Sequence, residues 1–596
     1  MIDCGIGADS AGAYPLRPYP TPSPALSSLL FAIYLAYAAC DAYFTFIFCR
    51  KPCGALLQAQ FRRTRLSLRN RLHTLTPEVL RSLQRGIEKE SLRVGPDGTL
   101  ASTPHPAALG SQLTHPHITT DFSESQLELI TGVHADVESC LEELTQIHQF
   151  VYRHIGDETL WCASMPCTLP ADKDIPIGRF GNSNVGRAKT VYRNGLSHRY
   201  GSRMQTISGI HYNFSVPEHA WPMLQQAAGI SGPVQTFQDA AYFSLIRTFR
   251  RHSWLLLYLF GASPAVCNSF VVGRDHGLRQ LVPGTLYLPW ATSLRMSPLG
   301  YQSAAQASLA VSYNNLDTYA HSLSDALTHP YPDYEKIGIR DGDDYRQLST
   351  TLLQIENEFY GTIRPKRPIH SGERPLHALR ERGVEYVEVR LMDLDPFCPI
   401  GITAATVRFL DIFLLHCLLS DGPADTPAEI VVLARNQLLV ARQGRDPNVL
   451  LTRGKHSLSP VEWGGELLRE CKPIADALDA AHRGSAYRDA LAAAASALGM
   501  SSITPSARVL QEMAQNYANS FPRFALTRSL QYKKELLELP LAPDAQSHFE
   551  SMAGESLLAQ RRIEAADTMP FDVYRQLYLS PDRLRAKRVS GTTVKR

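Results

Sequence analysis

The sequence predicts an α+β fold with a large antiparallel sheet, followed by a helical C-terminal layer. Apolar residues recur at helical spacing over 139–154 and 239–258, whereas 209–216 and 384–391 alternate side chains as strands do. Helices and strands do not alternate regularly along the chain, which argues against a doubly wound fold. After about residue 460 the chain is rich in alanine and leucine at helical spacing, over 467–482 and 486–498.

The composition indicates a globular protein and excludes several classes of function. The 596 residues are 44% hydrophobic and 20% charged, with a formal net charge of +3. The excess of basic residues is local, since five arginines fall within 62–71, and no aromatic or glycine-rich interleaving suggests nucleic-acid binding. Eleven cysteines show no recurring C-x-x-C pairs, so we expect independent thiols in a reducing cytosol.

The first 61 residues differ from the rest. Residues 10–24 are rich in proline, serine and tyrosine, and 27–49 are apolar apart from Asp41, long enough to cross a bilayer. One interpretation is a signal anchor that leaves the remainder in the cytoplasm. The other is a segment outside the working protein, for example a start assigned too early. We expect the second, and place the catalytic domain at 62–596.

The first of four segments that could carry chemistry is RGIEKESLR at 85–93. If this segment is extended, Glu88 and Glu90 point to one face, a few ångströms apart. Like charges so placed repel unless a cation lies between them. The alternative is a solvated strand edge beside Lys89 and Arg93, which this segment alone favours.

The second segment is TDFSESQLELI at 120–130. Ser123 followed by Gln126 fits a capping box, which predicts a helix with Asp121 just ahead of it. Glu124 and Glu128 would then share a helix face at i and i+4. A metal site would explain both acids, whereas a helix N-terminus that tolerates acids explains Asp121 and Glu124 better than Glu128.

The third segment, QTISGIHYNFS at 205–215, places His211, Asn213 and Ser215 on one strand face. A lone histidine is more often a hydrogen-bonded core residue than a ligand. The polar neighbours on its face raise the case for a site without deciding it.

The fourth segment, VEYVEVR at 384–390, places Glu388 and Arg390 together on a strand otherwise lined by valines. A carboxylate and a guanidinium in a sheet interior need partners. An internal salt bridge and a metal ligand beside a phosphate-binding arginine explain the pair equally well.

Together the four segments favour Mg²⁺ or Mn²⁺, because hard oxygen ligands prefer these ions. The glycine spacing at 181–186 lacks the lysine and the Ser/Thr of a phosphate-binding loop, so a nucleotide would be held by metals and arginines. The residues alone therefore predict an Mg²⁺-dependent phosphoryl-transfer enzyme or phosphohydrolase, with the substrate open.

From about residue 72 to 571, more weakly after about 425, the chain resembles the bacterial monomeric type of glutamate–cysteine ligase. The resemblance is carried by RGIEKESLRV, LTHPHITTDFSESQLELIT, MQTISGIHYNFS, YLFGASPAVC, LPWATSLRMSPLGY, LQIENEFYGTIRPKR, VEYVEVRLMDLDPF and AADTMPF. It implies a fold similar to glutamine synthetase, with an antiparallel sheet curved into a funnel, helices outside, and Mg²⁺ ions between ATP and glutamate.

Matched motif by motif, the resemblance also implies roles for single residues. Arg390 would meet the γ-phosphate of ATP. The metal ligands would be Glu88, Glu90, Asp121, Glu128, His211 and Glu388. The pocket for the incoming cysteine would be formed by Phe122, Tyr192, Leu196, Gln205, Arg295, Tyr301 and Tyr360.

The implied reaction joins the γ-carboxylate of glutamate to the α-amine of cysteine through γ-glutamyl phosphate, the first step of glutathione synthesis. We expect a cytoplasmic monomer with ATP, glutamate and cysteine as small-molecule partners and no nucleic acid. Three alternatives remain: a sister ligase that uses another amine, an Mg²⁺-dependent phosphohydrolase, and a silent membrane-tethered paralogue. The aromatic residues of the pocket favour cysteine, and the unbroken acidic set argues against a silent paralogue.

Overall fold

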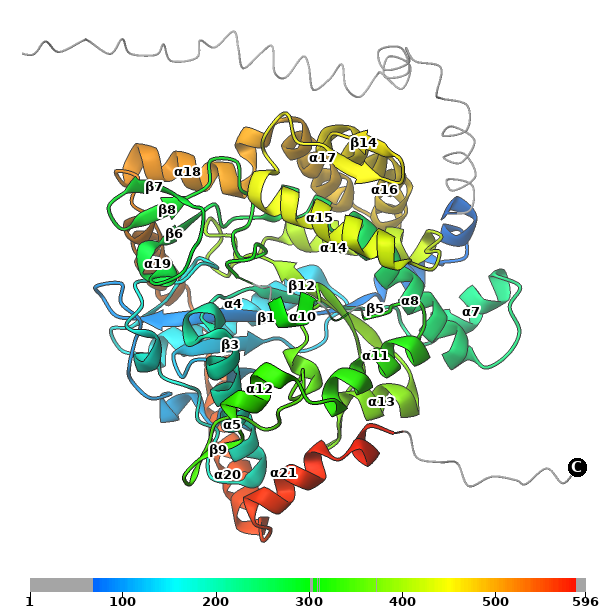
Figure 1. The fold of residues 1–596 in the computed structure, drawn as a ribbon. Coiled ribbons are helices and arrows are strands. Elements are labelled where there is room, and N and C mark those ends of the chain that lie inside the picture. Colours follow the sequence, from blue (N-terminus) through cyan, green and yellow to red (C-terminus); the bar gives the residue numbers. More distant parts are fainter. Residues whose placement is uncertain (1–67, 301–303, 308, 310, 371, 586–596) are drawn as a thin grey trace, which may run out of the picture. The chain divides into compact units, whose positions relative to one another are not determined.

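The computed structural model describes residues 68–585 except 301–303, 308, 310 and 371 (Figure 1). The chain divides into two units, Met1–Arg63 and Thr64–Arg596, and the described residues all belong to the second. The predicted extension 1–61, including its apolar stretch 27–49, and Tyr301 lie outside the described residues. Among the residues that are described, no helix combines the length and the apolar character needed to cross a membrane.

The centre of the second unit is a seven-stranded sheet with every neighbouring pair antiparallel. Its order is β11-β12-β5-β1-β3-β2, and β4 pairs with the end of β1. The strands are β1 (Gln84–Val94), β2 (Ile118–Thr120), β3 (Gln126–Ile130), β4 (Thr159–Leu160), β5 (Ile210–Ser215), β11 (Ile363–Lys366) and β12 (Tyr386–Met392). The predicted strands at 209–216 and 384–391 are thus confirmed as β5 and β12.

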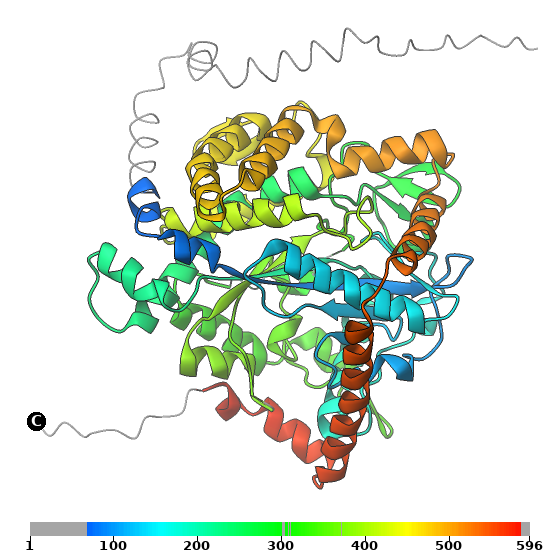
Figure 2. The same cartoon turned by 180° about the vertical axis from the view of Figure 1, so that it is seen from behind.

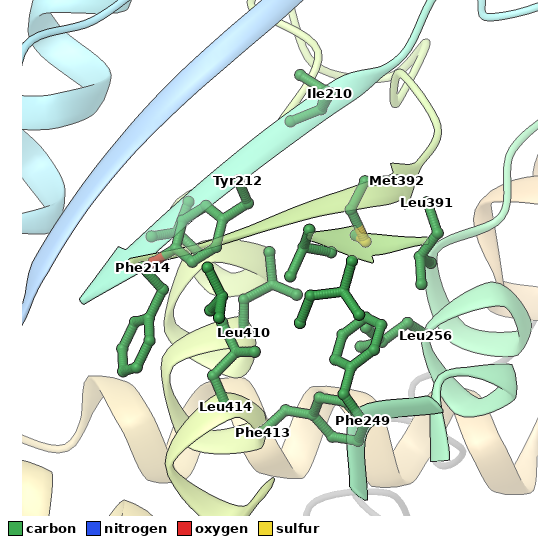
Figure 3. Close-up of a cluster of buried hydrophobic side chains, with 14 of the residues drawn as sticks. Ile210, Tyr212, Phe214, Phe249, Leu256, Leu391, Met392, Leu410, Phe413 and Leu414 are labelled. Carbon is green, nitrogen blue, oxygen red and sulfur yellow. The ribbon is translucent and has the colours of Figure 1, made fainter. Parts of the chain in front are cut away.

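One face of this sheet is apolar because alternate side chains point to opposite faces. Figure 3 shows Tyr212 and Phe214 of β5 pointing towards helices that carry further buried apolar side chains, and Ile210 belongs to the same core cluster. These helices are α8 (Val234–His252), α9 (Trp254–Phe260) and α14 (Ala404–Leu419). Full burial of one such side chain stabilises the fold by about 1.5–3 kcal/mol. The other face is left for polar residues.

Of the two helices predicted before the sheet strand at 384–391, one forms as a single helix and the other is divided in two. The helix predicted at 139–154 is α4 (Val137–His154), whose first turn is capped by the Asp136 carboxylate. Seen from behind, α4 (cyan) lies in front of the blue strands (Figure 2), and it packs against β1 and β3. The helix predicted at 239–258 is divided into α8 and α9, which meet at Ser253.

The helical C-terminal part is confirmed, and it includes the predicted helices at 467–482 and 486–498. It comprises α16 (Pro460–His482), α17 (Ala486–Gly499), α18 (Pro505–Asn516), α19 (Phe521–Glu538), α20 (Pro543–Ala566) and α21 (Phe571–Leu579), and it is preceded by α14 and α15 (Pro427–Gln443). In Figure 1, α14 to α17 lie on one side of the sheet, and α21 lies on the other side with α5 (Asn184–Tyr200). The C-terminal part therefore covers both sides of the sheet. The α+β fold with a curved antiparallel sheet and outer helices is the one predicted.

Shorter elements connect these layers. The helices are α3 (Pro77–Arg81), α6 (Ser202–Gln205), α7 (Ala220–Ala227), α10 (Ala304–Ala307), α11 (Leu316–Thr328), α12 (Pro332–Ile337) and α13 (Pro375–Arg382). The strands are β6 (Ala265–Cys267), β7 (Arg279–Val282), β8 (Thr285–Tyr287), β9 (Arg340–Asp341), β10 (Asp344–Tyr345), β13 (Leu451–Arg453) and β14 (His456–Leu458).

Candidate active site

Strand pairing places the acidic residues of separate segments on the polar face of the sheet. Glu88 of β1 lies opposite His211 of β5, and Glu90 lies opposite Glu128 of β3. On the other side of β5, Glu388 of β12 pairs with Asn213. Directly paired residues of antiparallel strands project to the same face, so the register alone assembles the cluster.

His211 lies at the centre of the cluster. Its Nδ1 is 3.1 Å from Glu88 Oε2 and 3.6 Å from Glu388 Oε1, and its Nε2 is 3.4 Å from Glu90 Oε1. The Asn213 amide donates to the second oxygen of Glu88 at 2.8 Å. One imidazole thus faces three carboxylates.

Two of the carboxylates are stabilised in the ionised form. Although burial opposes ionisation of Glu88, the hydrogen bond with His211 lowers its pKa to about 2. Burial likewise opposes the charge of Glu388, but Lys366 and Arg390 hold its pKa well below the usual range. The Nη1 of Arg390 is 2.9 Å from Glu388 Oε1, and Lys366 Nζ is 3.5 Å from Oε2.

The other two strand carboxylates, Glu90 and Glu128, are destabilised in the ionised form. Burial raises the pKa of Glu90. Burial, together with the charges of Glu88 and Asp121, raises the pKa of Glu128 well above its usual value. A cation between such carboxylates would relieve the repulsion.

The donor set fits a divalent cation that prefers oxygen ligands. One ligand atom each from Glu88, Glu128 and His211 lies within 4.8 Å of the others. Within the described part of the chain, the Oε2 of Glu388, which forms an ion pair with Lys366, and the Oδ1 of Asn213 are buried and accept no hydrogen bond. Oxygen atoms so placed are suitable ligands for Mg²⁺ or Mn²⁺.

The helix predicted after Ser123 is wrong, although Glu128 still faces the cluster. The Ser123 hydroxyl donates to the carbonyl of Pro176 instead of capping a helix, and residues 126–130 form β3. Glu124 accepts hydrogen bonds from the backbone amides of His105 and Arg179. Glu124 and Glu128 therefore do not share a face, because pairing with β1 outweighed the local capping pattern.

All the predicted site residues that are described line one cavity of about 420 Å³. Its lining includes the six carboxylate and histidine side chains, Arg390, and the predicted pocket residues Phe122, Tyr192, Leu196, Gln205, Arg295 and Tyr360. Tyr192 and Leu196 come from α5, so the sheet forms one wall and a helix another. The Gln205 amide donates to the Tyr360 hydroxyl at 2.8 Å, which joins two residues of the predicted pocket.

Several lining residues were not predicted from the sequence. Tyr574 and Tyr578 of α21 reach the cavity from the C-terminal layer. Lys189 and Arg193 of α5 also line it. The sequence feature that could have identified them is their helical spacing, because Lys189 and Arg193 lie seven and three residues before Leu196 and so share its helix face.

Solved structures define the class of protein as a ligase. The chain superposes on glutamate–cysteine ligase from Francisella tularensis in complex with AMP with a TM-score of 0.79 and 37% identity, covering 84% of this chain and 97% of that one. It also resembles a bifunctional glutathione synthetase from Pasteurella multocida, with a TM-score of 0.63 and 26% identity over 81% of this chain and 57% of that one.

Sequence relatives define the family. The sequence model of glutamate–cysteine ligase matches residues 70–440. The glutamate–cysteine ligase of Alcanivorax borkumensis is 48% identical over 516 residues, 85% of this chain and 98% of that protein. The glutamate–cysteine ligase of Azotobacter vinelandii is 49% identical over 504 residues, which cover 84% of this chain and 95% of that protein. The chain belongs to the glutamate–cysteine ligase family.

Proposed function

We propose that this protein joins the γ-carboxylate of glutamate to the α-amine of cysteine at the expense of ATP, giving γ-glutamylcysteine, ADP and phosphate. This is the first step of glutathione synthesis. The observation that carries the proposal is the cavity in which Glu88, Glu128 and His211 converge beside Arg390, in a chain that belongs to this ligase family.

The strand cluster would hold Mg²⁺, with Mn²⁺ as a possible substitute, and ATP is a co-substrate. The proposed ligands are Glu88, Glu90, Asp121, Glu128, His211 and Glu388. The convergence of the buried Glu90 and the half-buried Glu128, whose pKa values are both raised, supports this assignment. When bound, the metal supplies positive charge to the phosphates of ATP.

Arg390 and Glu388 are the proposed catalytic pair. Glu388 holds one Nη of Arg390 at 2.9 Å, which orients the guanidinium on the cavity wall. A guanidinium held in this way would bind the phosphate oxygens of ATP by charge-assisted hydrogen bonds. The γ-carboxylate of glutamate attacks the γ-phosphorus of ATP, and ADP leaves. The amine of cysteine then attacks the acyl carbon, the acyl–oxygen bond breaks, and phosphate leaves with the electron pair.

The protein's own thiols take no part in this scheme. No cysteine is among the described residues that line the cavity. Cys162, for example, is buried and Cys398 is half-buried, and burial raises the pKa of both thiols. An acyl phosphate, unlike a thioester, needs no cysteine side chain.

The setting of the reaction follows from the substrates. We infer that residues 62–596 form the catalytic domain, that residues 1–61 are not part of it, and that the enzyme works as a cytoplasmic monomer. The family match over 70–440 and a cavity lined by residues from Glu88 to Tyr578 support the domain assignment. ATP and the two amino acids are available in the cytoplasm.

An ADP-release assay tests the reaction. We expect ADP release to require Mg²⁺, glutamate and cysteine together, with γ-glutamylcysteine formed in equal amount. Each amino acid is tested alone and with the other, and a panel of other amines replaces cysteine. Release that is unchanged without amino acids would indicate a phosphohydrolase, and a preference for another amine would indicate a sister ligase.

A further inference from the structure

One face of α5 contributes a row of side chains to the cavity. Lys189, Tyr192, Arg193 and Leu196 are spaced as neighbours on a helix surface, and all four line the cavity. Tyr192 and Leu196 belong to the proposed cysteine pocket. Lys189 therefore lies one turn before the residues that would contact cysteine, on the same side of the helix.

Lys189 differs from the other basic side chains of the cavity. No hydrogen bond or ion pair joins its ammonium group to another residue in the described part of the chain. The ammonium nitrogen lies over the Phe180 ring, 5.1 Å from the ring centre, in a cation–π contact. The other basic side chains are held by carbonyl oxygens or by Glu388; these are Arg193, Arg295, Arg364, Lys366 and Arg390.

The neighbouring guanidinium of Arg193, in contrast, is held by hydrogen bonds within the protein. Its guanidinium donates to the backbone carbonyls of Asp121, Thr120 and Lys189. These bonds tie α5 to the loop that carries Asp121. Lys189 makes no such bonds to the backbone. Burial, together with the charge of Arg193, lowers the pKa of its ammonium to about 8, although the nearby Glu128 carboxylate acts in the opposite direction. An anion placed beside it would compensate that cost.

The substrates supply the anion. Cysteine brings an α-carboxylate that takes no part in the reaction and must be held while the amine attacks. The phosphate groups of ATP are better matched to Lys366 and Arg390, which already lie beside Glu388 on the sheet wall. The α5 wall is where the proposed cysteine pocket lies.

We propose that the Lys189 ammonium binds the α-carboxylate of the incoming cysteine and so orients its amine towards the acyl carbon. This inference rests on the proposed function. Lys189 is then a substrate-binding residue of the helix wall, distinct from the metal-binding carboxylates of the sheet wall.

Steady-state kinetics of Lys189→Met and Lys189→Arg test the proposal. Methionine keeps the length of the side chain and removes the charge. We expect Lys189→Met to raise the KM for cysteine by about tenfold to a hundredfold, the usual loss for a hydrogen bond to a charged group, while the KM values for ATP and glutamate stay within about twofold. Lys189→Arg should restore part of the loss. Lys173→Met, an exposed lysine outside the cavity, is the matched control.

Cysteamine, which is cysteine without its carboxylate, sharpens the test. Lys189→Met should lower kcat/KM for cysteine strongly and for cysteamine little, because the charge has no partner on cysteamine. An equal loss with both amines, or a rise confined to the KM for ATP or glutamate, would overturn the inference. If the wild type does not turn over cysteamine, the KM values decide. A wild type that forms no γ-glutamylcysteine would instead refute the proposed function.

Discussion

The two walls of the cavity are built in different ways. The sheet wall carries its functional side chains on paired strands whose opposite face is packed into the apolar core shown in Figure 3. The helix wall consists of α5 and α21, which are held to each other by side-chain contacts. Phe571 of α21 lies in one apolar cluster with Ala188 and Val191 of α5. In addition, the Asn184 amide of α5 donates at 2.7 Å to the carboxylate of Asp567, which follows α20.

This difference separates two tasks of the site. A residue such as His211 cannot move without moving β5, whose other face is fully buried, so the sheet wall can hold charged ligands at fixed spacing. The helix wall lies outside the paired strands, and so we expect that it can be altered without dismantling the sheet. We expect substitutions in the sheet wall to abolish catalysis and those in the helix wall to change substrate binding.

The largest effect is expected at the sheet wall. Glu88→Gln, Glu128→Gln and His211→Ala should each lower kcat by at least about a hundredfold, because each removes a proposed ligand of the metal. Isothermal titration should show weaker Mg²⁺ binding in the same variants. Near-normal activity of Glu128→Gln would show that β3 contributes no metal ligand to the site.

Stability provides the control for these variants. Because the pKa of Glu128 is raised in the folded state, its ionisation costs stability, and the free energy of unfolding falls as the pH rises through that pKa. Glu128→Gln should therefore be at least as stable as the wild type at neutral pH in the presence of a chelator. A lower melting temperature would show that lost activity reflects a damaged fold.

The second effect separates charge from geometry on the sheet wall. Arg390→Lys keeps the charge but loses the planar fork that can donate to two phosphate oxygens. We expect kcat to fall by about tenfold to a hundredfold, with the KM for cysteine nearly unchanged. The control is Arg367→Lys, because Arg367 pairs with Glu385 and does not line the cavity. Equal effects of the two substitutions would contradict the role of Arg390.

The sheet wall could largely be predicted from the sequence, and the helix wall only in part. The period-two alternation of 384–391 places Glu388 and Arg390 on one strand face, because Val387 and Val389 occupy the other. The local capping pattern at Ser123 predicted a helix because it contains no information about pairing with β1. Tyr574 and Tyr578 could not be predicted, because no local pattern shows that α21 returns to the cavity from more than 180 residues beyond Glu388.

A smaller effect is expected at the helix wall. Phe571→Ala removes a buried ring that also lies under the Arg187 guanidinium, 4.4 Å away. The contacts between α21 and α5 should weaken, so KM values should rise severalfold while kcat and Mg²⁺ affinity change little. Val573→Ala, on the exposed side of the same helix, is the matched control. A fall in kcat as large as that of Glu128→Gln would show that the two walls are not separable.

The smallest effect is expected from removing the N-terminal extension. Every described residue that lines either wall lies between Glu88 and Tyr578, and Asp41 would cost an inserted span of 27–49 about 2.5–3.5 kcal/mol on insertion scales. A protein that starts near Arg62 should be soluble, with kcat and all three KM values within about twofold of those of the full chain. The full-length protein should fractionate with the cytosol. Recovery of the full chain in washed membranes, together with lost activity after truncation, would show that the extension is an anchor on which the site depends.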